Sequence, residues 1–192
     1  MRLFVALDID EEIRTRLERF VREVKPLAPD IRFVGTETFH VTLKFLGETG
    51  KLESLQRTLR GVRASQFKLS FRDTGFFPNQ RAPRVFWAGI HAGPGLESLA
   101  NLIGWAVAPL GFPTEPGPYH PHLTLARSGS GNPRMRSHER PNSKFQQLQE
   151  RLASMPQPDF GTMTAREFFL YESRLSPRGA SYHKLERYAL EP

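Results

Sequence analysis

The chain contains the same short motif twice, at a fixed spacing. The sequence HVTL, which begins at His40, recurs 82 positions later as HLTL, which begins at His122. The segment RLFVAL, which begins at Arg2, resembles RVFWAG, which begins at Arg84, and the offset is again 82. Two separate matches that share one offset indicate an internal duplication. The two halves of the chain are therefore expected to fold alike.

Amphipathic segments occupy corresponding places in the two halves. Apolar residues recur at intervals of three and four within 13–24 and within 96–107, which predicts a helix in each. The residues expected to face the core are Ile13, Leu17, Phe20, Val21 and Val24 in the first helix, and Leu96, Leu99, Leu102, Ile103 and Val107 in the second. Similar patterns within 52–59 and 145–152 predict a second pair of helices, at an offset of 93.

The longer second offset implies extra residues in the second half. The polar, basic segment from Ser128 to Lys144 is the expected place for them, because its Gly and Pro residues are typical of an exposed loop. Such a loop is either a tolerated insertion or a flexible cationic arm for RNA.

Runs of β-branched and aromatic residues predict the remaining strands. These runs are 32–34, 39–46, 67–71, 84–90, 119–126, 162–170 and 182–190. Their close spacing favours antiparallel pairing. We therefore expect a duplicated, two-lobed α+β fold in which two mainly antiparallel sheets face a central cleft, with helices on the outer faces. It is predicted to be a single bilobal domain over residues 1–192, with pseudo-repeats at roughly 1–80 and 81–192.

The composition narrows the classes of function. The chain has 27 Lys and Arg against 20 Asp and Glu, so its formal net charge of +7 favours an anionic partner such as nucleic acid or phosphate. The absence of cysteine excludes disulfides, thiolate metal sites and a cysteine nucleophile. The N-terminal apolar run is too short for a signal peptide, and the longest later run, Ile103–Leu110, is too short to span a membrane. We expect a cytoplasmic protein with no membrane association.

The repeated motif places one histidine and one threonine on the same side of each predicted strand. Side chains alternate between the two faces of a strand, so His40 and Thr42 share one face while the apolar residues between and after them occupy the other. The same holds for His122 and Thr124. If an approximate two-fold axis relates the halves, both pairs converge on the central cleft.

Two imidazoles and two hydroxyls in a basic cleft suit phosphodiester cleavage. One neutral histidine accepts a proton from the attacking oxygen while one protonated histidine gives a proton to the leaving oxygen, and a near-neutral pKa permits both states. The hydroxyls of Thr42 and Thr124 can donate hydrogen bonds to the non-bridging oxygens in the transition state. This chemistry requires no metal ion.

A zinc site is the competing hypothesis for the same histidines. Zinc hydrolases use three protein ligands, often a helical His-x-x-x-His pair or a carboxylate, and that spacing is absent here. His120 could add a third imidazole to His40 and His122.

On these motifs the chain resembles the two-histidine (2H) phosphoesterase superfamily, and within it the bacterial RNA 2′,3′-cyclic phosphodiesterases, also called 2′-5′ RNA ligases. The matching segments span nearly the whole chain: RLFVAL, FHVTLKFLGE, RVFWAGI, HPHLTLAR and FLYESRLSPRGASYHKL. Paired HxTx motifs are typical of the superfamily, and the flanking KFLGE and LAR favour this branch.

The resemblance implies an enzyme that hydrolyses the terminal 2′,3′-cyclic phosphate of RNA to a 2′-phosphate without a metal or other cofactor, and that can run in reverse as a 2′-5′ RNA ligase. It implies that His40 protonates the departing 3′ oxygen and that His122 activates water. Arg127 would contact phosphate or stack on the base, and Phe4 would offer a second stacking face. Strand alternation further places Lys44 on the His40 face, where it would steer the anion.

The expected partners are RNA ends or small nucleotides that carry a 2′,3′-cyclic phosphate, acted on by a monomer. Two other functions stay open at this stage. The chain could be a different 2H phosphodiesterase, acting on ADP-ribose 1″,2″-cyclic phosphate or on 2′-5′ oligoadenylate. It could also be a non-catalytic module that binds RNA ends, although both histidines are present.

Overall fold

The first sheet brings the two ends of the chain together. The computed structural model describes residues 1–128, 143–177 and 179–192. The strand order in this sheet is β3-β1-β8-β9, and each neighbouring pair is antiparallel. The strands are β1 (Arg2–Leu7), β3 (Val41–Glu48), β8 (Glu167–Ser176) and β9 (Gly179–Ala189).

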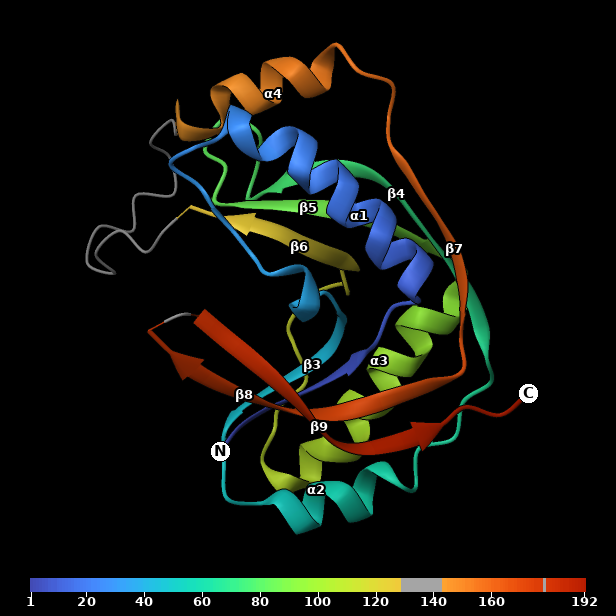
Figure 1. The fold of residues 1–192 in the computed structure, drawn as a ribbon. Coiled ribbons are helices and arrows are strands. Elements are labelled where there is room, and N and C mark those ends of the chain that lie inside the picture. The colour runs from blue at the N-terminus through green and yellow to red at the C-terminus, as the bar shows by residue number, and fades with distance from the viewer. Residues whose placement is uncertain (129–142, 178) are drawn as a thin grey trace.

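The second sheet holds the middle of the chain. Its order is β2-β6-β5-β4-β7, and its pairs are antiparallel as well. The strands are β2 (Arg32–Phe33), β4 (Phe67–Phe77), β5 (Val85–Ala92), β6 (His122–Arg127) and β7 (Asp159–Ala165). The predicted α+β class with two antiparallel sheets is confirmed. Figure 1 shows the two sheets one above the other, with β3, β8 and β9 below β4, β5 and β6.

The two sheets repeat one arrangement, but they exchange strands between the halves of the sequence. In the first sheet β1 lies between β3 and β8, and in the second β5 lies between β6 and β4. Strand β4 comes from the first half of the chain and joins the second sheet, whereas β8 and β9 return from the second half to the first sheet. Each lobe is therefore built from both halves, because a central strand must find a hydrogen-bonding neighbour on each edge.

The helices also cross between the sheets. They are α1 (Glu11–Val24), α2 (Leu52–Leu59), α3 (Pro94–Val107) and α4 (Gln146–Ala153). Helix α1 follows β1 of the first sheet and packs against β7 of the second, while α3 follows β5 and packs against β3 and α2. Figure 1 shows α1 across the face of the second sheet and α2 at the opposite end of the molecule.

The amphipathic patterns predicted the buried helix faces with one exception. All five residues expected to face the core from α1 are buried. In α3 the expected Leu102 is 36% exposed, while Ala100 and Gly104 are buried. The buried residues of α3 follow one another at intervals of three and one, and Leu102 lies at the edge of that stripe. One apolar cluster, which includes Leu7, Leu17, Phe71 and Phe86, joins both sheets and the helices.

Two expectations about chain connections have different outcomes. The single strand predicted at 162–170 is wrong, because the structure divides it at Arg166 into β7 and β8, which belong to different sheets. The insertion expected between Ser128 and Lys144 falls almost entirely on 129–142, outside the described residues. In the part of the chain that is described, no helix has the length and apolar character needed to cross a membrane.

Candidate active site

The first histidine motif lies at the start of β3, next to β1. Thr42 pairs with Ala6 and Lys44 pairs with Val5, so Leu43 is an extra residue in β3 and forms a bulge. A bulge reverses the alternation of faces beyond it. Phe45, rather than Lys44, therefore follows Thr42 on the face that carries His40.

The second motif repeats this irregularity in β6, next to β5. Thr124 pairs with Trp87 and Ala126 pairs with Phe86, so Leu125 is the extra residue. Arg127 consequently follows Thr124 on the face of His122. Phe45 and Arg127 are thus corresponding positions of the repeat, separated by the same 82 residues as the two histidines.

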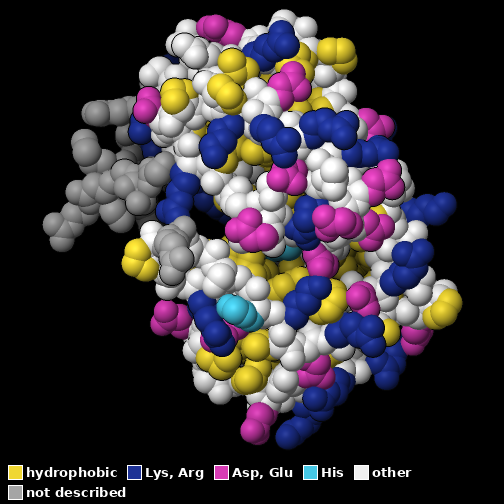
Figure 2. Space-filling model, viewed as in Figure 1, with side chains coloured by type: hydrophobic (Ala, Val, Ile, Leu, Met, Phe, Trp, Pro, Cys, Tyr) yellow, Lys and Arg dark blue, Asp and Glu magenta, His cyan; other side chains and the backbone are white. Residues whose placement is uncertain are grey.

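These two strand faces line one pocket of about 240 Å³. His40, Thr42, His122, Thr124 and Arg127 all contribute, whereas Phe4 and Lys44, which were also expected beside the substrate, do not line it. The other lining residues are Val34, Thr38, Phe45 and Tyr182. Figure 2 shows a hollow across the middle of one face of the molecule, with hydrophobic side chains inside it and Lys, Arg, Asp and Glu side chains around it.

Both histidines are held in the same tautomer by the backbone two residues before them. Nδ1 of His40 lies 2.6 Å from the carbonyl oxygen of Thr38, and Nδ1 of His122 lies 2.8 Å from that of His120. A carbonyl oxygen only accepts hydrogen bonds, so each Nδ1 carries the hydrogen and donates it. Within the described residues neither Nε2 has a hydrogen-bond partner, so each Nε2 is free to accept or give a proton in the pocket.

Burial favours the neutral form of both rings. It lowers the pKa of His40 to about 4, against opposing effects of the Thr38 hydrogen bond and the Asp8 charge. Burial also lowers the pKa of His122, partly offset by the hydrogen bond to His120, and Arg127 adds to the lowering. Both imidazoles of the free protein are therefore bases near neutral pH, and an anion bound between them would raise the pKa of each.

The hydroxyls and the guanidinium complete an anion-binding surface. Nη2 of Arg127 donates a long hydrogen bond of 3.5 Å to Oγ1 of Thr124. Thr42 is fixed through its backbone, because the hydroxyl of Tyr119 donates to its carbonyl oxygen at 2.7 Å. Proton carriers, hydroxyl donors and a cation in one small pocket can perform acid–base chemistry on a phosphodiester.

Phe4 lies behind His40 rather than in the pocket. Its ring centroid is 4.9 Å from that of His40, and it stacks on Tyr171 at 5.0 Å with an angle of 7° between the planes. It is 4% exposed. The stacking of Phe4 on a base stays a prediction. The structure offers Phe45 and Tyr182 as the aromatic rings that do line the pocket.

Lys44 does not face the histidines, contrary to the expectation from strand alternation. It is 5% exposed, and its Nζ donates to the carbonyl oxygen of Pro113 at 2.5 Å and to Glu115 at 3.0 Å. The bulge at Leu43 is the reason, because it moves Lys44 to the other face. Its charge anchors the 113–115 segment.

Phe45 and Tyr182 line the pocket although they were not among the residues expected from the sequence. The signal for Phe45 was present, since it stands 82 positions before Arg127. Tyr182 comes from β9, on the far edge of the first sheet's order, and its ring meets His40 edge-on at 5.0 Å. No local pattern in the sequence indicates that contact.

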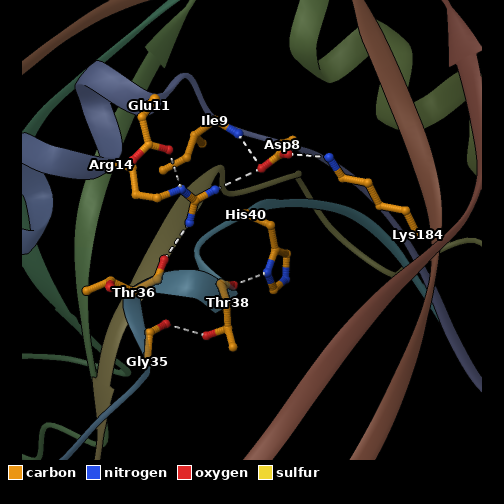
Figure 3. Close-up of polar contacts among 9 residues, drawn as sticks. All are labelled: Asp8, Ile9, Glu11, Arg14, Gly35, Thr36, Thr38, His40 and Lys184. Carbon is orange, nitrogen blue, oxygen red and sulfur yellow. Dashed lines mark hydrogen bonds and ion pairs between the residues drawn. The ribbon is translucent and has the colours of Figure 1, made fainter.

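A charged network lies on the other side of His40. Asp8 accepts a hydrogen bond from Arg14 at 2.9 Å and pairs with Lys184, and Nη1 of Arg14 donates to the carbonyl oxygen of Thr36 (Figure 3). Asp8, Arg14 and Lys184, together with His40, line a second hollow of about 450 Å³. The network ties β1, α1 and β9 to the segment that carries His40.

The described residues contain no group of three or more His, Asp or Glu side chains arranged to hold a metal ion. His120 is exposed and lines a different hollow from His40, and His122 lines both.

Comparison with known proteins places this arrangement in a family. The model of LigT-like phosphoesterases matches residues 7–87 and 91–182. The chain is 35% identical over 187 residues to the RNA 2′,3′-cyclic phosphodiesterase of Archaeoglobus fulgidus, covering 96% of this chain and 98% of the relative. It is 30% identical over 194 residues to the RNA 2′,3′-cyclic phosphodiesterase of Escherichia coli, covering 98% and 96%.

Solved structures agree with the sequence comparison. The structure of Escherichia coli LigT complexed with 3′-AMP has a TM-score of 0.77 at 30% identity, covering 98% of this chain and 97% of that one. The structure of TT0787 of Thermus thermophilus has a TM-score of 0.76 at 30% identity, with the same coverage of both chains.

Proposed function

The chain belongs to the LigT-like phosphoesterase family, and from that premise we propose that it hydrolyses the terminal 2′,3′-cyclic phosphate of RNA to a 2′-phosphate. The observation that carries this proposal is the pair of histidines. His40 and His122 line one pocket from corresponding strands, and each presents Nε2 because Nδ1 is held by a backbone carbonyl. The names of full-length relatives support RNA as the substrate.

The two rings have opposite roles in the proposed reaction. Nε2 of His122 takes a proton from water as the water oxygen attacks phosphorus. The bond from phosphorus to the 3′ oxygen breaks, and protonated Nε2 of His40 gives its proton to that oxygen. The products are a 2′-phosphomonoester and a free 3′-hydroxyl, and the two histidines end with their protons exchanged. The assignment of acid to His40 follows the family resemblance.

The surrounding side chains stabilise the negative charge that develops on the non-bridging oxygens of the phosphate. Thr42 and Thr124 donate hydrogen bonds to the non-bridging oxygens, and Arg127 supplies a positive charge beside Thr124. With these donors and two proton carriers the reaction needs no metal ion.

The anionic substrate itself prepares the acid. Burial keeps both histidines neutral in the free protein, and the phosphate charge raises the pKa of the ring that must be protonated. The substrate therefore brings the enzyme into its active protonation state. Reverse 2′-5′ ligation follows from the same groups by microscopic reversibility. The monomeric state and the cytoplasmic location remain predictions.

The test is hydrolysis of a nucleoside 2′,3′-cyclic phosphate in EDTA, with the product identified by chromatography against authentic 2′- and 3′-phosphates. We expect the 2′-phosphate, and we expect His40→Ala and His122→Ala each to lose about 10²- to 10⁴-fold in rate. Circular dichroism of the variants checks that they fold.

The same experiment separates the competing functions. A 3′-phosphate product, loss of activity in EDTA, or full activity in either alanine variant contradicts the proposal. Turnover confined to ADP-ribose 1″,2″-cyclic phosphate or to 2′-5′ oligoadenylate would assign another substrate. Tight binding of cyclic-phosphate RNA without turnover would assign a binding module.

A further inference from the structure

Another hollow adjoins the pocket lined by His40 and His122, which we call the histidine pocket. It has a volume of about 490 Å³, and it shares Thr42, Phe45 and His122 with that pocket. From there it extends to Trp105 on α3, and we call it the aromatic groove. Its size falls in the range typical of small-molecule sites. Any polymer that places its end between the histidines has this groove beside it.

Two large aromatic side chains of the groove are exposed to solvent. Trp105 is 63% exposed and Phe45 is 64% exposed. Isolated exposed apolar residues are common, but two aromatic rings that line one hollow beside a candidate active site indicate a binding surface. Aromatic faces stack on nucleobases of every type, and each stacked base contributes about 1–3 kcal/mol.

The charge of the groove is balanced, which favours a base over a phosphate. Its lysine, Lys44, is buried and bound to Glu115 at 3.0 Å and to the carbonyl oxygen of Pro113. The wall is also preorganised, because Tyr119 donates to the carbonyl oxygen of Thr42 and burial raises the pKa of that tyrosine. A rigid, neutral and aromatic surface suits a flat heterocycle.

A glycine within a helix keeps the groove open. Gly104 lines it from α3, where glycine costs about 1 kcal/mol relative to alanine. A Cβ atom at this position would meet only Cγ2 of Thr114, at 3.9 Å. Close packing therefore does not explain the glycine, whereas a larger side chain would project into the groove.

We propose that the aromatic groove binds the base of the penultimate nucleotide of an RNA strand. This nucleotide is joined to the 5′ side of the terminal nucleotide, which carries the 2′,3′-cyclic phosphate. This inference rests on the proposed function, and it makes oligoribonucleotides the preferred substrate class over mononucleotides. The terminal nucleotide occupies the histidine pocket, and its 5′ neighbour is the only residue to which it is joined. The base of that neighbour stacks on Trp105.

The experiment compares a nucleoside 2′,3′-cyclic phosphate with a dinucleotide that ends in the same group. For the wild type, kcat/KM is higher for the dinucleotide. Trp105→Ala lowers the dinucleotide value by roughly 5- to 150-fold, the equivalent of one stacked base, and leaves the mononucleotide value unchanged. Trp105→Phe keeps most of the preference because it retains an aromatic face.

A second pair of variants tests the groove without touching tryptophan. Gly104→Met fills the groove and abolishes the dinucleotide preference, whereas Gly104→Ala is the matched control and retains it. Binding of the 2′-phosphorylated dinucleotide product quenches the fluorescence of Trp105 in the wild type, and the corresponding mononucleotide does not. The other tryptophan, Trp87, is partly buried and pairs with Thr124, so the same titration of Trp105→Phe measures its contribution to the signal.

The outcomes separate this inference from the proposed function. Hydrolysis of the mononucleotide by the wild type reports on the histidines alone. Equal kcat/KM for both substrates, or an equal loss for both in Trp105→Ala, overturns the assignment of a second base, and the latter result would place the terminal base in the groove. Preference unchanged in Gly104→Met also overturns it, and would leave the groove to a protein partner.

Discussion

Nδ1 of His40 donates a hydrogen bond to the carbonyl oxygen of Thr38 over 2.6 Å, and this contact decides which ring nitrogen can do chemistry. The corresponding bond from His122 to His120 measures 2.8 Å. Each carbonyl lies two residues before its histidine, so the local chain fixes the tautomer without a carboxylate partner. Among the residues that the structure describes, neither ring is hydrogen-bonded to a carboxylate that would hold its proton, and the substrate anion is left to perform that task.

We predict that the pH optimum moves upward when substrate binds. Burial lowers the pKa of both His40 and His122 below 6.5, so both limbs of the bell-shaped profile of kcat/KM, which reports the free enzyme, lie on the acid side of 6.5. In the complex the phosphate charge raises both values, so the profile of kcat lies at higher pH. Initial rates from about pH 4 to 9 measure both profiles. Coincident optima would contradict the role assigned to the substrate charge.

The sequence predicted the fold class because its evidence was local and repeated. Helical periodicity located α1 and α3, and the offset of 82 located the paired strands that carry the histidines. It could not predict that β4 pairs with β5, or that β8 pairs with β1 and β9 pairs with β8. Such pairings depend on which strand edges are free once the chain collapses, and no local pattern records that.

In the site, too, local features could be predicted from the sequence and long-range features could not. Alternation along a regular strand placed His40 and Thr42 on one face, and that placement needs only two residues of regular strand. Beyond Thr42 the bulge at Leu43 reverses the faces, so Lys44 leaves the pocket and Phe45 enters it. Tyr182 reaches the pocket from another part of the chain. Bulges and long-range contacts are tertiary features, so alternation alone could not anticipate them.

Asp8 is predicted to raise the pKa of His40 from the side of the ring that faces the second hollow. Its carboxylate raises that pKa against the larger effect of burial, and it pairs with Arg14 and Lys184, whose charges stay in place when Asp8 is changed. Asp8→Asn therefore lowers the pKa of His40 further and leaves that of His122 in place. Proton NMR titration of the imidazole C2 protons in the free enzyme measures both values.

Glu11→Gln is the matched control for Asp8→Asn. Glu11 also faces Arg14, at 3.6 Å, but its side chain is 85% exposed and its charge is not among the influences on His40. The control variant should titrate like the wild type. If Asp8→Asn changed the pKa of His122 as much as that of His40, the substitution would disturb the fold in general rather than remove a local charge effect.

The two threonines are predicted to act on the transition state. Thr42→Val and Thr124→Val each keep the shape of the side chain and remove the hydroxyl donor. Loss of one preorganised donor to a developing charge costs about 10²- to 10³-fold in kcat. We expect KM for the nucleoside 2′,3′-cyclic phosphate to change little, because the donors act on charge that appears as water attacks. Thr→Ser at each position retains the donor and should retain most activity, and a serine variant as slow as the valine variant would indicate a packing effect instead.

Lys44 is predicted to contribute to stability rather than to anion capture. Lys44→Met leaves the carbonyl of Pro113 and the carboxylate of Glu115 without their donor, which costs about 1–3 kcal/mol in the free energy of unfolding. Urea denaturation measures this loss, and kcat/KM for the mononucleotide should stay near the wild-type value. Lys51→Met is the control, because Lys51 is exposed and its Nζ donates to the carbonyl of Leu110 and lies 5.9 Å from the centre of the Phe112 ring, so its hydrogen bond is open to water. A large rise in KM with unchanged stability in Lys44→Met would instead indicate that Lys44 attracts the anionic substrate.

The burial of His40 also predicts how stability depends on pH. Its pKa is about 4 in the folded protein and about 6.5 in the unfolded chain, so between these values the unfolded state binds more protons. The contribution of His40 to the free energy of unfolding is therefore fully present above pH 6.5. It is lost as the pH drops toward 4, by up to about 3 kcal/mol. His122 adds a loss of the same sign, because its pKa is lowered as well. In His40→Asn the urea midpoint should fall less steeply across this range, while the same change at exposed His183 serves as the control for losing a histidine. If the urea midpoints of wild type and His40→Asn depended on pH in the same way, His40 would have the same pKa in the folded protein and in the unfolded chain. The substrate would then not be needed to raise the pKa of His40.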